Sequence, residues 1–332
     1  MPVLAADQIM ADTTLGLVSG LDELLVVEIG GRRVLYAFSR AESQLLEIEI
    51  AADGSLGLSG RLSLSGSVSA GVSDGLAYGA GVLFLSGFSE VNGQQVSLSA
   101  TGVLGSQQAI SGVGLLDSPT AVDVGGASVL IAEHGNGGLA HFTNSGSGYV
   151  SGVGLADMSD RYLADVSASV SFVEGGTQYV ATASTTEHGI NIAAISAGGL
   201  TQIGALGTLD GLPIANPADL DVLQRLDETL LVVASVGTSS LSVLNVESGR
   251  PALLDHIYDS SESRFQGAQS VAAVTYSDFG FVAAGGAEGG VSLLTVLPGG
   301  RLIHLDSVVE DETVPLDQIA GLDMFVVGNT LN

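Results

Sequence analysis

Apolar and polar positions along the chain form a pattern that returns six times: an apolar strand, a turn, a second apolar strand and a glycine-centred turn. The densest apolar segments begin 47 to 51 residues apart, at 34–37, 82–85, 129–132, 179–182, 230–233 and 281–284. The turn glycines keep the same step, at Gly54, Gly102, Gly148, Gly199, Gly249 and Gly300. A period of about 50 residues made only of strands is typical of a β-propeller with one four-stranded blade per repeat.

Polar alternation supports this interpretation within the repeats. Val96, Leu98 and Ala100 alternate with Ser97 and Ser99, which is the period of a strand with one solvated face. Few windows show a helical period, and glycine and β-branched residues interrupt those that do. We therefore expect an all-β propeller with less than about a tenth of the chain in helix.

The repeat boundaries predict a single propeller domain over residues 1–332. The expected blades are 22–70, 71–117, 118–163, 164–217, 218–267 and 268–316, followed by a partial repeat at 319–332. Residues 321–327 resemble residues 20–27, so both are expected to be first strands, the later copy with no second or third strand after it. Residues 14–19 could supply an outer strand of this closing blade. We interpret the chain as part of a longer protein whose seventh blade is begun and not completed.

The charge balance is strongly acidic. Thirty-six acidic residues face nine basic ones, all arginines, which gives a net charge of −27. This charge repels nucleic acid and anionic lipid, so neither is an expected partner. No apolar run reaches the roughly 18 residues of a membrane span, so we expect no membrane insertion. The acidity has two interpretations: it keeps the protein soluble in salt, or some carboxylates bind a divalent cation such as calcium.

Cysteine is absent, so no disulfide can stabilise the fold, and this absence assigns no compartment. Residues 1–11 hold no basic residue and no apolar core of the kind found in a Sec signal peptide. Export would therefore use another signal.

A repeated tripeptide provides the first candidate site. Glu133 and His134 precede Gly135, and Glu187 and His188 precede Gly189, in each case after the second strand of a blade. These loops are expected on the face that carries the connections between blades. Two His/Glu pairs there could bind a transition metal or act as acid and base. The alternative is that the tripeptide only repeats the chemistry of a turn.

Carboxylates near the connections between blades provide a second candidate, a calcium site. The residues are Asp219, Asp221, Asp259, Glu310 and Asp311. Calcium prefers six to eight oxygen ligands, which acidic loops can supply. The alternative is that these side chains are merely solvated. An EF-hand sequence and the tandem calcium nonapeptide are both absent.

The blade pattern resembles two groups of proteins. Segments 189–200 and 290–302, in which Gly-Ile or Gly-Val leads to a Gly-Gly-Leu or Gly-Gly-Arg-Leu turn, carry most of the likeness. One group is the lactonase-like, YVTN-type propellers, related in architecture to WD40 repeats. The other is the N-terminal propeller region of bacterial RTX proteins, the secreted hemolysin-type calcium-binding proteins. The RTX resemblance implies type I export and calcium binding, and the lactonase resemblance implies ring-opening hydrolysis at the channel mouth without assigning any residue here.

Two hypotheses of function follow. The first is a non-enzymatic binding or scaffold propeller from a secreted, extracellular or cell-surface protein, which binds a protein, glycan or small molecule on its face. The second is a lactonase-like hydrolase in which His134 or His188 meets a carboxylate at the channel mouth. A cytoplasmic location is the alternative to export.

Overall fold

The computed structural model describes residues 10, 20–66, 75–88, 93–114, 116–133, 137–225, 228–311, 316 and 318–332, and the main chain alone of Glu133. Within these residues the regular structure is strand, apart from two three-residue 3-10 helices, η1 (Thr208–Asp210) and η2 (Glu247–Gly249). The predicted all-β fold is confirmed. No helix among the described residues is long and apolar enough to cross a membrane.

Six antiparallel sheets follow one another along the chain. The strands of the first three are β1 (Leu21–Ile29), β2 (Arg32–Ser39), β3 (Gln44–Ile50), β4 (Leu56–Ser63), β5 (Leu76–Gly79), β6 (Val82–Leu85), β7 (Gln94–Leu98), β8 (Leu104–Ala109), β9 (Asp117–Val124), β10 (Ala127–Glu133), β11 (Gly138–Asn144), β12 (Tyr149–Ser151) and β13 (Leu155–Ala156). The strands of the next three are β14 (Val166–Glu174), β15 (Thr177–Ser184), β16 (Gly189–Ser196), β17 (Gly199–Gly207), β18 (Pro217–Arg225), β19 (Glu228–Ser235), β20 (Ser240–Asn245), β21 (Ala252–Tyr258), β22 (Ser270–Tyr276), β23 (Phe279–Gly285), β24 (Gly290–Val296) and β25 (Leu302–Val309).

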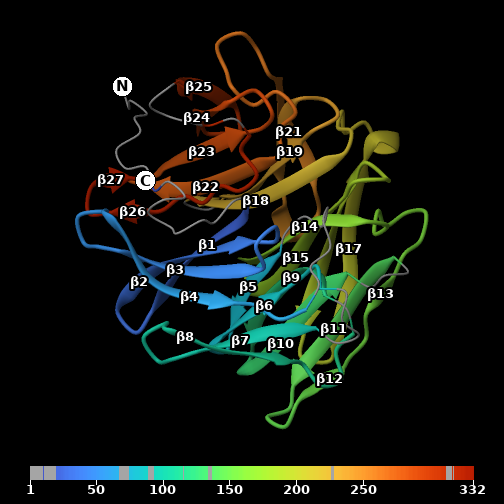
Figure 1. Cartoon of the computed structure of the whole chain (residues 1–332). Coiled ribbons are helices and arrows are strands. Elements are labelled where there is room, and N and C mark those ends of the chain that lie inside the picture. The colour runs from blue at the N-terminus through green and yellow to red at the C-terminus, as the bar shows by residue number, and fades with distance from the viewer. Residues whose placement is uncertain are drawn as a thin grey trace.

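Each sheet is one blade of a propeller, with its strands paired in chain order (Figure 1). The first strand of every blade lies nearest the central axis, and residues of all six first strands line one shared cavity there. In the third blade the outer strand is split, and β12 and β13 both pair with β11. The predicted propeller of six four-stranded blades is therefore confirmed.

The core lies between the blades. On β15, Tyr179 and Ala181 pack toward the fifth blade, whereas Val180, between them, packs toward the third. Both faces of the strand are buried, which explains why the second strand of each repeat is an unbroken apolar run. The same arrangement joins every neighbouring pair from the first blade to the sixth.

Residues 319–332 continue the ring after the sixth blade. They form a short hairpin of β26 (Val326–Val327) and β27 (Thr330–Leu331), which was expected to be a first strand alone. That expectation is wrong because Gly328, with a φ of 58°, and Asn329 make a two-residue hairpin turn. The main chains of Phe325 and Asn332 also bond to each other in both directions, which extends the pairing. The outer strand expected at 14–19 lies outside the described residues.

Candidate functional site: the central cavity

A cavity of about 530 Å³ lies where the first strands of the blades converge. This volume falls within the range of small-molecule sites, roughly 300–1,000 Å³. Its wall holds residues from β1, β5, β9, β14, β18 and β22, together with residues 318–323. The described residues that line it include Asp22, Glu23, Leu24, Leu25, Arg40, Leu76, Pro119, Ser169, Val170, Asp219, Asp221, Gln269, Gln318, Leu322 and Asp323.

Asp219 and Asp221 stand two residues apart on β18, so they point to the same side of the strand. The Oδ2 atom of Asp219 accepts hydrogen bonds from the main-chain N–H of Val271, at 2.7 Å, and from the hydroxyl of Ser270, at 3.2 Å. The Oδ2 atom of Asp221 accepts one from the N–H of Ala273, at 2.7 Å. Their Oδ1 atoms accept the N–H of the residue that follows each aspartate. The two carboxylates therefore join the fifth blade to the sixth.

Asp323 makes the same contact at the other end of the ring. Its Oδ2 atom accepts the N–H of Val26 on β1 at 2.6 Å, and its Oδ1 atom accepts the N–H of Met324 at 2.7 Å. The C-terminal segment is thus bonded to the first blade through a carboxylate in the cavity wall.

Arg40, in the turn after β2, is the one basic residue among the described residues that line the cavity. Its Nη2 atom lies 3.2 Å from Oε1 of Glu23, and its main-chain N–H donates to Oδ2 of Asp22 at 2.7 Å. The side chains of Arg40 and Glu23 are only 11% and 16% exposed, so this ion pair is largely shielded from solvent. It places a paired carboxylate beside the neighbouring aspartates.

Burial raises the pKa of four carboxyl groups in the wall. The pKa of Glu23 rises to about 7, against the opposing charge of Arg40. Burial raises the pKa of Asp221 to about 7, and those of Asp219 and Asp323 to about 6. The wall therefore exchanges protons close to neutral pH, a property that recurs at functional sites.

His188 lies in the turn between β15 and β16, with a φ of 57°. Its Nδ1 atom accepts the main-chain N–H of Asn216 at 3.0 Å. Glu187, beside it, uses Oε2 to accept the N–H of Ala164 at 3.0 Å. Both contacts tie the turn to loops between blades, and neither residue is part of the cavity wall.

The other pair of the repeated tripeptide is only partly visible. The main chain of Glu133 ends β10, and His134 lies outside the described residues. The structure therefore places one of the two predicted pairs, and that pair lies in a turn.

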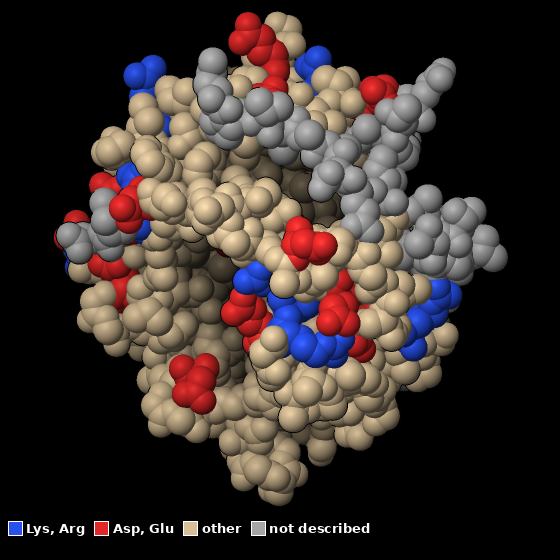
Figure 2. All heavy atoms as spheres, turned by 90° about the vertical axis from the view of Figure 1, so that its left-hand side faces the viewer, with Lys and Arg blue, Asp and Glu red and all other residues tan. Residues whose placement is uncertain are grey.

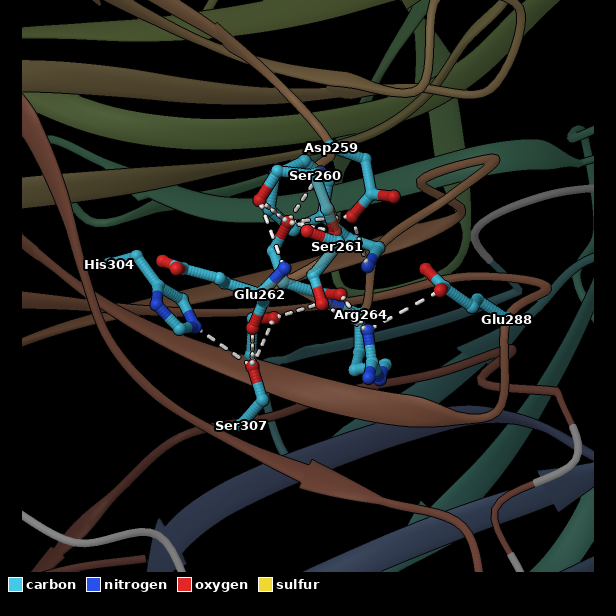
Figure 3. A network of polar contacts seen from close by, with 11 residues as sticks. Asp259, Ser260, Ser261, Glu262, Arg264, Glu288, His304 and Ser307 are labelled. Carbon is cyan, nitrogen blue, oxygen red and sulfur yellow. Dashed lines mark hydrogen bonds and ion pairs between the residues drawn. The ribbon is translucent and has the colours of Figure 1, made fainter.

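Of the five predicted calcium ligands, Asp219 and Asp221 lie together in the cavity wall, and the others lie elsewhere. Asp259 belongs to a polar network in the loop after β21 (Figure 3), where its Oδ1 atom accepts the hydroxyl of Ser263 at 2.8 Å. Glu310 and Asp311 follow β25.

A common metal site for these residues does not emerge from the part of the chain that the structure describes. No group of three or more His, Asp or Glu side chains there converges as metal ligands would. In addition, both oxygens of Asp219 and both oxygens of Asp221 already accept main-chain N–H groups. The structure brings together two of the five predicted ligands, and calcium binding stays a prediction.

The same loop network extends to the sixth blade. In Figure 3, Arg264 lies between the loop and Glu288, with its Nη1 atom 3.4 Å from Oε1 of Glu288. His304 and Ser307, on β25, are joined through Nε2 and Oγ at 2.8 Å. Burial, followed by the charge of Asp259, raises the pKa of Glu288. The network ties the loop at 259–264 to the sixth blade.

Glu23 and Arg40 were not among the predicted site residues. Each interrupts an apolar context: Glu23 in the strand that opens the first repeat, and Arg40 directly after the second strand. A charge beside an apolar run was a usable signal at both positions, as it was for Asp219 and Asp221 on β18. Figure 2 shows a hollow beside a gathering of acidic and basic side chains, with further charged side chains around the edge of this face.

Comparison with known proteins supports the architecture alone. No family model and no curated protein matches the sequence. Among solved structures, a provisional 6-phosphogluconolactonase from Bacteroides uniformis is 13% identical with a TM-score of 0.65, covering 89% of this chain and 86% of its own.

Two further structures show the breadth of the likeness. A provisional 6-phosphogluconolactonase from Bacteroides fragilis is 12% identical with a TM-score of 0.53, and the match covers 80% of this chain and 78% of that protein. The SapL1 lectin, in complex with alpha methyl fucoside, is also 12% identical, with a TM-score of 0.53 and coverage of 88% and 97%. Proteins described as enzymes and as lectins thus share this fold, so the likeness defines a propeller and no activity.

Proposed function

We propose that this protein is a non-enzymatic binding propeller whose central cavity holds a small polar ligand. The observation that carries the proposal is the cavity itself, which measures about 530 Å³ and is lined by residues of all six blades and by a cluster of charged groups. Convergent polar groups in a preformed cavity of this size are the usual mark of a ligand site. The wall is also built into the ring, because three of its carboxylates hold neighbouring strands together.

The test is a ligand screen by thermal shift on the full chain and on a variant with its cavity filled. Val170 lines the cavity and carries no charge, so Val170→Trp should occupy the space and leave the charged wall intact. We expect ligands that raise the melting temperature of the native chain to lose this effect in Val170→Trp. Hits that stabilise both proteins equally would place binding elsewhere and refute the proposal.

A lactonase-like hydrolase is the second candidate, and the Glu23–Arg40 pair is the observation that favours it. A carboxyl group with a pKa of about 7 is suited to act as a general base near neutral pH. Glu23 would take a proton from water as the water oxygen attacks the lactone carbonyl. The ring C–O bond would then break, and the alkoxide would take the proton to give a hydroxy acid. Arg40 would stabilise the developing oxyanion.

Acid release from a panel of sugar lactones, followed in a pH-stat against the spontaneous rate, tests this second candidate. A hydrolase should lose at least about a hundredfold in rate in Glu23→Gln, as removal of a general base does. An unmodified rate equal to the spontaneous rate for every lactone would leave binding as the function.

We also propose that the chain comes from a secreted, acidic protein exported by a type I-like route. The motivation is the composition and the resemblance to the RTX propeller region. Fractionation of cells that express the natural gene tests it, and a protein found only in the cytoplasm would refute it. Calcium binding is tested by titration calorimetry at millimolar calcium, where an absence of heat would remove it.

A further inference from the structure

Carboxylates and apolar side chains line the cavity together. Glu23, Asp219, Asp221 and Asp323 belong to the wall, and each is only partly exposed. Leu24, Leu25, Leu76, Pro119 and Val170 contribute apolar surface to the same wall. The last four of these also line a groove of about 420 Å³, which adds Val27, Ala77 and Tyr78.

The carboxylates of the wall keep unused acceptor capacity. A carboxylate offers about four acceptor positions, and Asp221 and Asp323 each use two of theirs on main-chain N–H groups. Five acidic residues and one basic residue occur among the described residues of the wall. The cavity therefore attracts a positive charge and offers it hydrogen-bond acceptors.

Arg40 adds a cationic hydrogen-bond donor to the same wall. Its guanidinium pairs with Glu23 through Nη2, and the residue lines the cavity with a side chain that is 11% exposed. A guanidinium carries five N–H donors, so it favours a ligand that has an acceptor oxygen as well as a positive charge.

We infer that the ligand is a small primary amine with an apolar chain, its ammonium group held by the carboxylates and its chain lying against Leu25, Leu76 and Val170. An oxygen on the same molecule would pair with Arg40. A quaternary ammonium fits less well, because it is recognised by aromatic faces and none of the described residues in this wall is aromatic. This inference rests on the proposed function, since it names the ligand class of the same cavity.

Titration calorimetry with four probes of similar length tests the inference. The probes are n-pentylamine, 5-aminopentan-1-ol, 1-pentanol and pentanoate, in phosphate buffer at pH 8 because Tris is itself an amine. We expect saturable binding of the two amines, tighter for 5-aminopentan-1-ol, and no binding of 1-pentanol or pentanoate. At pH 5 the amines should bind more weakly, because the carboxylates are then largely protonated.

Two variants locate the site. Glu23→Gln should weaken amine binding by about tenfold or more, the loss expected for a charge-assisted hydrogen bond. Asp255→Asn is the matched control: Asp255 joins β21 to the N–H of Leu302 in the same manner, yet it does not line the cavity. It should bind amines as the native chain does. Should Glu23→Gln fail to fold, Val170→Trp provides the test, since it should abolish amine binding with every carboxylate retained.

The outcomes separate the inference from the proposed function. Equal amine binding by the native chain and Val170→Trp would refute the inference. Binding of 1-pentanol in place of the amines would also refute the inference. If Val170→Trp abolished that binding, the cavity would still be a ligand site and the proposed function would stand. If no probe bound and no screened ligand distinguished the native chain from Val170→Trp, the inference and the proposed function would both be refuted.

Discussion

The carboxylate of Asp323 accepts the main-chain N–H of Val26 at 2.6 Å, in the same register in which Asp221 accepts the N–H of Ala273. Asp323 stands four residues before the end of β26, and Asp221 stands four before the end of β18. Val26 and Ala273 each stand three residues before the end of their own strands. Residues 321–327 therefore occupy the place of a first strand in a seventh position, between the sixth blade and the first.

Removal of this carboxylate should loosen the closure of the ring. Asp323→Ala leaves the N–H of Val26 without its acceptor, and we expect the free energy of unfolding to fall by about 1–3 kcal/mol. Urea denaturation measures the loss. Hydrogen exchange should become faster at residues 321–331 and on β1, while exchange on β22 stays slow.

Asp221→Ala is the matched comparison for Asp323→Ala, because it removes the same contact from inside the ring. Its faster exchange should appear on β22 instead of β1. Unchanged protection of Val26 in Asp323→Ala would show that the contact does not hold the two ends of the chain together.

His188 is expected to act in its turn and not in chemistry. His188→Ala removes the acceptor for the N–H of Asn216 and keeps a Cβ at a positive φ, so we expect a loss of about 1–2 kcal/mol in the free energy of unfolding. His188→Asn, which tolerates this conformation better, should lose less. Ligand binding and any lactone hydrolysis should be unchanged in both variants. A loss of either activity in a folded His188→Ala protein would return this residue to the site.

Much of the fold could be predicted from the sequence because the spacing of apolar residues reveals the repeat. A second strand such as β15 is buried on both faces, so its residues must be apolar and its recurrence every 50 residues or so is visible. The hairpin of β26 and β27 was missed because it has only two strands and two paired positions, too short to show a strand period. Its turn, Gly328 and Asn329, was the available signal.

The site was predicted only in part, for a physical reason. Asp219 and Asp221 were selected as loop carboxylates, but they lie on a strand, and their partners are main-chain N–H groups about 50 positions away. Every residue except proline has a main-chain N–H, so the residue type at a position does not reveal that it binds one of these carboxylates. Glu23 and Arg40 likewise meet only when the turn after β2 folds back over β1, which sequence spacing alone does not define.

Arg40 is expected to keep Glu23 partly ionised near neutral pH. Its charge is the main influence that lowers the pKa of Glu23 against burial, so Arg40→Gln should raise that pKa above about 7. Carbon-detected NMR titration of the glutamate carboxyl groups measures the change. Arg250→Gln, at an exposed position outside the cavity wall, should leave the Glu23 titration where it is. An unchanged Glu23 titration in Arg40→Gln would show that the pair contributes little in solution.

The stability of the protein should decrease as the pH rises through neutrality. Burial raises the pKa of Glu23 and Asp221 to about 7 and that of Asp219 and Asp323 to about 6, above the value of about 4 for an unfolded carboxyl group. The folded state therefore holds protons that the unfolded state releases. Their stabilising contribution is complete below pH 4 and is lost as the pH rises through 6 to 7.

Urea denaturation at pH 5 and pH 8, at constant ionic strength, measures this dependence, and we expect the lower free energy of unfolding at pH 8. The net charge of −27 acts in the same direction through general repulsion, so a local control is needed. Asp221→Asn removes one of the buried groups that titrate, and it should reduce the difference between the two pH values. Asp255→Asn, which removes the same charge outside the cavity wall, should keep the difference close to that of the native chain. Equal slopes in the two variants would assign the pH dependence to overall repulsion and not to the cavity carboxyls.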